Sequence, residues 1–202
     1  MTTTLQKNPM DAGSVILAAV VVSAIGALFY NVLPVYLGTA QDSKGLDNRE
    51  IGFISSAFFL GYNLVTFTAF YWIRRLSWRL ITLVSTPIAA LGLYASTLTD
   101  SYGMLLLATG IAGGAFAALY GVGTTVLSDT SDPTRWYGLK IAAEGLIGAI
   151  LLLLLPPLLI SRYGFEGMVG GLLLTMLLLS PLLLFLPARG TKTYEQELQE
   201  FR

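Results

Sequence analysis

One carboxylate lies inside a long apolar stretch of this sequence. Glu144 stands in the run Ile141-Ala142-Ala143-Glu144-Gly145, and Lys140 precedes it by four residues, on the same face of a helix. A charge within hydrocarbon costs at least roughly 2.5–3.5 kcal/mol, so this one needs a reason. Two interpretations stay open. Glu144 either pairs with Lys140 and reaches with it toward the membrane interface, or it is a protonatable group beside a water-filled path.

Neutral polar side chains also interrupt the apolar runs. They occur as Tyr30-Asn31, as Tyr62-Asn63 and as Tyr120. An asparagine in such surroundings usually hydrogen-bonds a neighbouring helix, which is worth under roughly 1 kcal/mol on average. Asn31 and Asn63 therefore either join helices or line a pathway.

Two short polar turns carry basic residues beside aromatic ones. Residues 72–79 read Trp-Ile-Arg-Arg-Leu-Ser-Trp-Arg, and residues 129–138 include Asp129, Asp132, Pro133 and Arg135. Such turns are typical of interfacial anchoring. Charges at equivalent places in two three-helix units would also suit a gate, in which ion pairs form in one conformation and separate in another.

The composition requires a lipid environment around these residues. Apolar residues make up 54% of the chain and charged residues 12%, about half the charged share of a soluble domain. The 12 basic and 12 acidic residues cancel, which excludes nucleic-acid binding driven by net charge. Cys and His are both absent, so disulfides, Cys or His metal sites and Cys–His or Ser–His catalysis are excluded. We expect no enzyme activity, no metal and no cofactor.

The apolar runs have the length of membrane-spanning helices. A span needs roughly 20 mostly apolar residues, and no run shows the alternation of a barrel strand. We therefore expect an all-α membrane protein with a cytoplasmic segment at 1–12, a six-helix bundle at 13–190 and an amphipathic tail at 191–202. The first run is too long for the core of a signal peptide, which favours a retained span. The expected spans are about 13–37, 51–73, 80–98, 103–127, 139–161 and 168–186.

Two interpretations of the tail stay open. Tyr194, Leu198 and Phe201 share one helical face, which favours a short helix that docks at the interface. A solvated acidic tail fits the same residues.

The basic residues predict the orientation. With six spans both ends lie on one side, and most basic residues share that side, which favours cytoplasmic termini. On the inside would be Lys7, Arg74, Arg75, Arg79, Arg135, Lys140, Arg189, Lys192 and Arg202, and on the outside only Lys44, Arg49 and Arg162. We expect a multi-pass protein of a bacterial cytoplasmic (inner) membrane.

The layout and its turns resemble the amino-terminal six-helix half of the major facilitator superfamily. The likeness rests on the start of the second run at 49–53, the glycine-rich run at 110–115, and Arg135 followed by Gly138. The turn after the second helix departs from the family pattern. Arg74 stands where the family usually has an Asp, and Phe70 and Ser77 stand where it has Gly. That Asp makes a charge pair that holds the outward-facing state in the family.

The resemblance implies secondary transport or facilitation of a small solute by alternating access. The solute would be neutral, apolar or cationic, because no cation at mid-membrane depth compensates an anion. The bundle would work as a parallel homodimer or with a second six-helix half. The alternative is a non-transporting scaffold or assembly subunit that retains the fold. Under the transport hypothesis the pathway residues are Tyr30, Asn31, Tyr62, Asn63, Tyr120 and Glu144, and the cytoplasmic gate residues are Arg75, Arg79 and Arg135.

Overall fold

The protein is a bundle of long helices. The computed structural model describes residues 8–191, of which none forms a strand. The basic residues Lys7, Lys192 and Arg202, and the expected tail helix with Tyr194, Leu198 and Phe201, lie outside these residues. The long helices are α1 (Gly13–Lys44), α2 (Asn48–Trp72), α3 (Trp78–Leu98), α4 (Tyr102–Ser128), α5 (Pro133–Leu155) and α6 (Ser161–Leu179). The short helical turns are η1 (Pro9–Asp11), η2 (Pro156–Ile160) and η3 (Ser180–Phe185).

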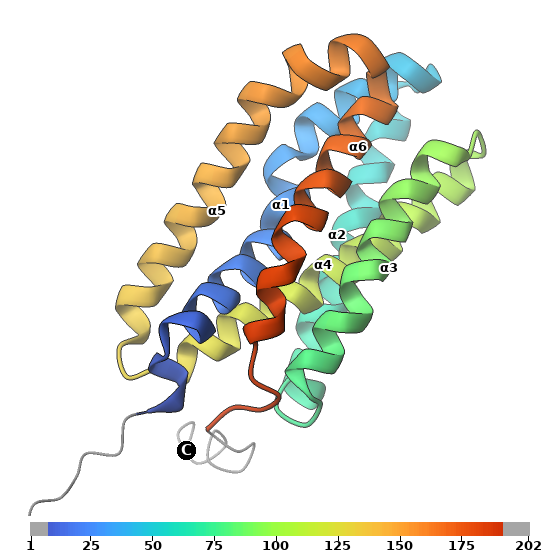
Figure 1. Cartoon of the computed structure of the whole chain (residues 1–202). Helices are drawn as coiled ribbons and strands as arrows, with labels where there is room; N and C mark the ends of the chain where they lie inside the picture. The colour runs from blue at the N-terminus through green and yellow to red at the C-terminus, as the bar shows by residue number, and fades with distance from the viewer. Residues whose placement is uncertain (1–7, 192–202) are drawn as a thin grey trace, which may run out of the picture.

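Successive helices run up and down the bundle (Figure 1). Residues 8 and 191 lie at the same end, together with the α2–α3 and α4–α5 connections; we call this the termini end. Local sequence explains where several helices begin. Asp47 and Glu50 form a reciprocal capping box at the start of α2, and Asp132 caps α5 ahead of Pro133.

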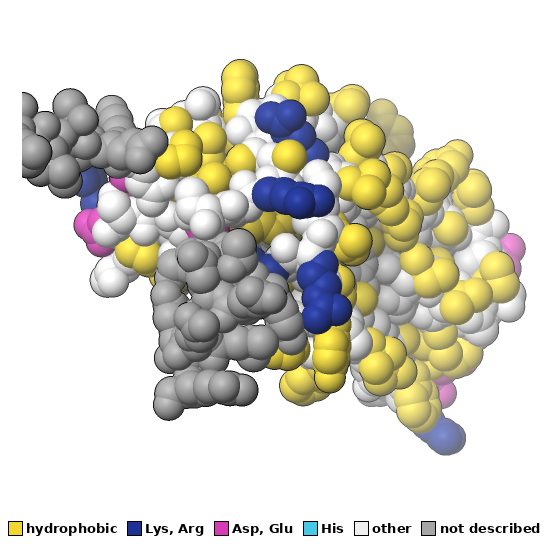
Figure 2. Space-filling model, turned by 90° about the horizontal axis from the view of Figure 1, so that it is seen from below, with side chains coloured by type: hydrophobic (Ala, Val, Ile, Leu, Met, Phe, Trp, Pro, Cys, Tyr) yellow, Lys and Arg dark blue, Asp and Glu magenta, His cyan; other side chains and the backbone are white. Residues whose placement is uncertain are grey.

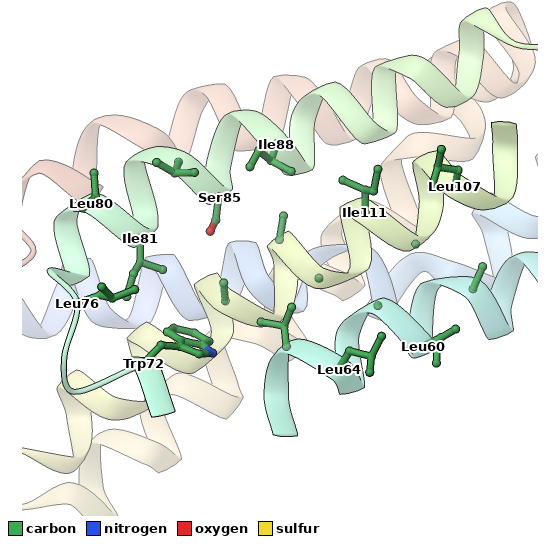
Figure 3. A pocket seen from close by; sticks show the side chains of 18 of the residues that line it. Leu60, Leu64, Trp72, Leu76, Leu80, Ile81, Ser85, Ile88, Leu107 and Ile111 are labelled. Carbon is green, nitrogen blue, oxygen red and sulfur yellow. The ribbon is translucent and has the colours of Figure 1, made fainter. Parts of the chain in front are cut away.

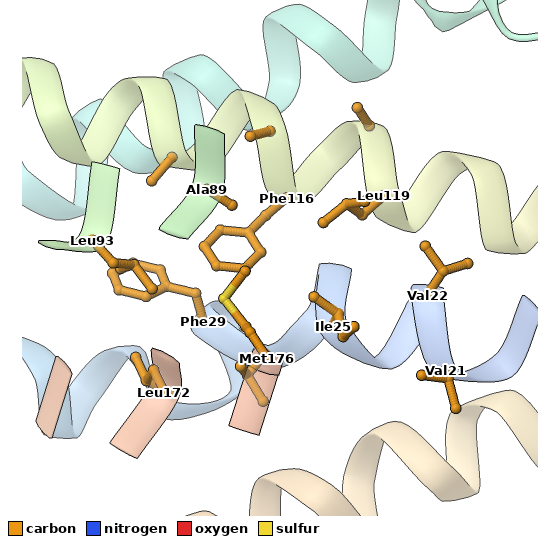
Figure 4. Close-up of a cluster of buried hydrophobic side chains, with 14 of the residues drawn as sticks. Val21, Val22, Ile25, Phe29, Ala89, Leu93, Phe116, Leu119, Leu172 and Met176 are labelled. Carbon is orange, nitrogen blue, oxygen red and sulfur yellow. The ribbon is translucent and has the colours of Figure 1, made fainter. Parts of the chain in front are cut away.

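Helix α1 forms the centre of the bundle. The most apolar window of α1 is 78% buried, whereas that of α2 is 11% buried. Phe29 of α1 packs against Phe58 of α2 and Phe116 of α4, with ring centroids 4.7 and 5.8 Å apart. Helices α3 and α6 complete this core with Leu93 and Met176, among other side chains (Figure 4). Because α1 is enclosed on most sides, any polar group on it must find a partner within the bundle.

Helices α2 and α4 approach one another closely through glycine. A Cβ atom added to Gly61 would fall on the carbonyl oxygen of Gly110, and one added to Gly113 would fall on that of Phe58. Small residues at these positions let two backbones meet, which is a common means of helix association in membranes. The glycine-rich run at 110–115 supplies the small residues on the α4 side of this contact.

Helix α1 is longer than the expected span at 13–37. Pro34 neither ends nor interrupts it, and the helix continues to Lys44, where Gly45 takes a left-handed conformation with φ +66°. A proline removes one backbone donor, and neighbouring helices can accommodate this loss in a membrane bundle. Most of the connection expected at 38–50 is therefore helix.

The number of expected spans differs from the number of long apolar helices. Among the described residues, five helical stretches are long and apolar enough to cross a membrane, one fewer than expected. The fifth stretch, 133–185, includes both α5 and α6. Its backbone departs from helical geometry at Gly164, where φ is 55° and ψ is −132°. Here the chain turns at the end opposite the termini, and α6 returns along the bundle (Figure 1).

Candidate functional site

Glu144 is the centre of a buried polar cluster between α1 and α5. Its Oε1 atom lies 2.9 Å from Nζ of Lys140, and it accepts a hydrogen bond of 2.8 Å from the Ser23 hydroxyl. Both charged side chains are at least nine-tenths buried. Asn31 of α1 donates to the Glu144 backbone carbonyl at 3.2 Å. The expected Lys140–Glu144 pair therefore forms, but it lies within the bundle and does not reach out to the interface.

Three tyrosines from three helices extend this cluster along one face. The ring centroids of Tyr30, Tyr62 and Tyr120 lie 6.2–6.4 Å apart in every pairing. The ammonium of Lys140 lies 3.9 Å from the centroid of the Tyr120 ring, within the range of a cation–π interaction. Like Asn31, the three tyrosines are half-buried. The bundle thus places partly open aromatic faces beside a buried ion pair.

Asn63 does not join the other predicted pathway residues. It is exposed on α2, although its neighbour Tyr62 faces the cluster. One residue along a helix turns the side chain by about 100°, so adjacent residues face different surroundings. Five of the six predicted residues meet in one place, and Asn63 lies outside it.

A buried ion pair at the termini end was not predicted. Nη1 of Arg74 lies 2.7 Å from Oδ2 of Asp129, and almost none of either side chain is exposed. The same oxygen accepts a hydrogen bond from the Thr191 amide, and the Asp129 carbonyl accepts one from Asn8. Trp78 packs beside the Arg74 guanidinium. The pair thus joins the two polar turns to both terminal segments.

In the family pattern, the turn after the second helix supplies the acidic member of a charge pair. In this chain the same turn supplies the basic member, Arg74. The carboxylate comes instead from the end of α4. The sequence contained one signal for this pairing, since an arginine in place of an aspartate calls for an acidic partner nearby. Asp129, in the other polar turn, is such a residue.

The three predicted gate arginines lie at the termini end but in separate environments. Arg75 is exposed in the α2–α3 connection. Arg135 is exposed at the start of α5 and stacks on its neighbour Trp136. Arg79 donates from Nε to the carbonyl of Leu186, on the side of α3 that faces η3. Basic side chains lie among hydrophobic ones on this end of the molecule (Figure 2).

A wide groove lies elsewhere and is almost entirely apolar. It has a volume of about 900 Å³ between α2, α3 and α4 (Figure 3). Leu60, Trp72, Ile88 and Ile111 are among its lining residues, and Ser85 is one of its few polar ones. A groove with so few polar groups orients a polar solute poorly. We therefore assign the candidate site to the cluster of Tyr30, Asn31, Tyr62, Tyr120, Lys140 and Glu144, called the polar cluster below.

Across residues 8–191, no three acidic side chains come together in a way that could hold a metal ion. The cluster instead offers one carboxylate, one ammonium and three aromatic faces. These groups can bind a small solute through hydrogen bonds and cation–π contacts.

Together, the long apolar helices and the embedded polar cluster define a helical integral membrane protein. The family model of the Major Facilitator Superfamily matches residues 15–200, and the chain belongs to this superfamily. This confirms the resemblance seen in the sequence. A comparison with curated proteins gave no match. Members of the superfamily are transporters and not enzymes, so the family assigns a transporter-type function in general terms.

Proposed function

We propose that this protein is a secondary transporter or facilitator of a small solute, and that the polar cluster is its half of the translocation pathway. The observation that supports this most strongly is the convergence of Tyr30, Tyr62, Tyr120 and Glu144, from four helices, on one partly open face. Polar side chains that only joined helices would be scattered among separate contacts.

The open face of the cluster calls for a second bundle. Half-buried phenol and amide groups would lose their hydrogen-bond partners if lipid covered them. A second unit of the same topology, facing this side, would enclose them in a water-filled cavity. We propose that this unit is a second copy in a parallel homodimer, or a second six-helix half. Alternating access then consists of rocking the two bundles about the cavity.

The proposal takes α5 and α6 as separate spans, which gives six in a three-plus-three layout. The turn at Gly164 supports this because it reverses the chain between two helices. Phe165 donates to the hydroxyl of Ser43 beyond this turn, so the end of α1 holds the start of α6 in place. We place the termini end in the cytoplasm of a bacterial cell, at its inner membrane. Arg74, Arg75, Arg79, Arg135 and Arg189 lie at that end, and Lys44, Arg49 and Arg162 lie at the other.

The ion pair suggests how the solute is recognised. Lys140 places its ammonium against both Glu144 and the Tyr120 ring, which are the two groups that a solute cation would use. A cationic solute would compete with Lys140 for them, and a proton on Glu144 would release Lys140 in the same way. We propose that this exchange couples solute binding to movement of α5 relative to α1. Arg75 and Arg135, both exposed, remain our proposed gate residues toward the second unit.

Reconstitution of the purified protein into liposomes tests the function. We expect two bundles per assembly by mass in nanodiscs, and saturable uptake of at least one member of a panel of small cationic, neutral and apolar solutes. A matched liposome preparation without protein gives the passive leak of each solute. A strictly single bundle with no uptake above this leak would contradict the proposal.

The alternative is a scaffold subunit that has kept the fold without the activity. The observation that favours it is the closed ion pair, since Lys140 already satisfies Glu144. This alternative predicts that a variant lacking both charges keeps every property of the wild type. The transport proposal predicts that such a variant folds and is inactive.

A further inference from the structure

A second polar feature lies on the outer side of the bundle, away from the polar cluster. A crevice of about 470 Å³ separates α3 from η3. Arg79 is one of its lining residues, and its Nε donates to the Leu186 carbonyl, which fixes the guanidinium beside η3. Among the described residues, no hydrogen bond or ion pair uses the two Nη groups. Four donor hydrogens of one cation thus remain for a ligand.

Two hydroxyls inside the crevice lack partners. Thr82 and Thr86 both line it, and neither Oγ1 atom is exposed or hydrogen-bonded within residues 8–191. Thr82 as a whole is 4% exposed. A threonine in a helix commonly donates to the carbonyl four residues earlier, as Thr109 and Thr124 do here. Buried hydroxyls without partners are costly, so a ligand that supplies acceptor oxygens would be bound favourably.

The groups follow one another in a definite order along α3. Arg79 is at the first turn, Thr82 lies about 4.5 Å deeper and Thr86 about 10 Å deeper, at 1.5 Å per residue. Leu83, Leu183 and Leu184 make up much of the remaining wall. A phospholipid has the same sequence of groups, because its phosphate lies at the surface, its ester carbonyls below and its chains deepest. Hydroxyls donate to ester carbonyls, and arginine donates to phosphate through charge-assisted hydrogen bonds.

We propose that the α3–η3 crevice binds an anionic phospholipid of the membrane leaflet at the termini end. Its phosphate binds Arg79, and one chain lies against the leucines. Its ester oxygens accept from Thr82 and Thr86 after the two hydroxyls rotate about χ1 to face the crevice. The negative charge complements the basic end of the molecule (Figure 2). A free anion would not account for the apolar wall, and an apolar partner helix would leave the two hydroxyls and the guanidinium without acceptors.

Native mass spectrometry of the detergent-purified protein, titrated with phosphatidylglycerol, tests this proposal. We expect Arg79→Gln to weaken binding of the first lipid by about tenfold, as for loss of one charge-assisted contact. Arg189→Gln, an exposed arginine at the same end, is the matched control and should bind as the wild type does. Phosphatidylcholine with identical chains should bind more weakly than phosphatidylglycerol.

The double variant Thr82→Val, Thr86→Val separates lipid binding from folding. It should bind phosphatidylglycerol more weakly, while the lipid-free protein keeps or gains thermal stability because two unpaired hydroxyls are removed. Wild-type lipid affinity in both this variant and Arg79→Gln would overturn the proposal. Displacement of the lipid by millimolar inorganic phosphate would point to a free-anion site and would also overturn it.

Discussion

Replacing Glu144 with glutamine should lower the free energy of unfolding by about 3–5 kcal/mol. The reason is that Lys140, which is almost fully buried, would keep its positive charge without a counter-charge. The paired change Lys140→Met, Glu144→Gln should recover most of this loss, because it leaves no buried charge. The measurement is reversible unfolding in mixed micelles, followed by circular dichroism, for both variants and the wild type.

Transport should respond differently from stability in the same variants. We expect the paired variant to fold and to show no solute uptake, because the groups proposed to exchange partners are gone. Glu166→Gln, an exposed carboxylate at the other end of the bundle, is the control and should match the wild type in both assays. A Glu144→Gln protein as stable as the wild type would refute the buried pair, and an active paired variant would refute its role in transport.

The second large effect is expected at the Arg74–Asp129 pair. Arg74→Gln should destabilise the protein by about 3–5 kcal/mol, since Asp129 would retain a charge in a site closed to water. The loss should be visible as a lower midpoint of thermal unfolding in detergent. The exposed neighbour Arg75, changed to Gln, is the matched control and should shift the midpoint little.

Removal of both charges of this pair should restore folding. Arg74→Met combined with Asp129→Leu is expected to unfold close to the wild-type midpoint, because apolar replacements of a buried pair are often neutral. The single variants Arg74→Met and Asp129→Leu are measured beside the double variant. If the double variant loses as much free energy of unfolding as the two single variants together, the two residues do not act as a pair.

The sequence predicts the polar cluster better than it predicts the ends of the bundle. Glu144, Tyr30, Tyr62 and Tyr120 stand out because a polar group inside an apolar run is costly, so each needs a partner. That reasoning needs no knowledge of helix orientation. It fails for Asn63, since every face of α2 is rich in apolar residues and no periodicity shows which face lies inward.

The remaining differences come from contacts between residues far apart in the chain. Arg74 and Asp129 are 55 residues apart, and the one sequence signal for their pairing was an arginine at a position where the family has an aspartate. Helix α1 extends past the expected end at residue 37 because it continues through Pro34, which lies exposed on its surface, as far as the left-handed Gly45. The turn between α5 and α6 depends on the positive φ of Gly164, one of many glycines in the chain.

The central claim is that the polar cluster faces water within the membrane, and cysteine labelling in liposomes tests it directly. The chain has no cysteine, so single-cysteine variants need no prior changes. A charged, membrane-impermeant maleimide reacts with thiolates that water reaches. We predict that Tyr62→Cys reacts at least about tenfold faster than Leu153→Cys, whose native side chain is 73% exposed on the outer surface of α5. Equal, slow labelling at both positions, with rapid labelling of Arg189→Cys at the termini end, would contradict a water-filled pathway.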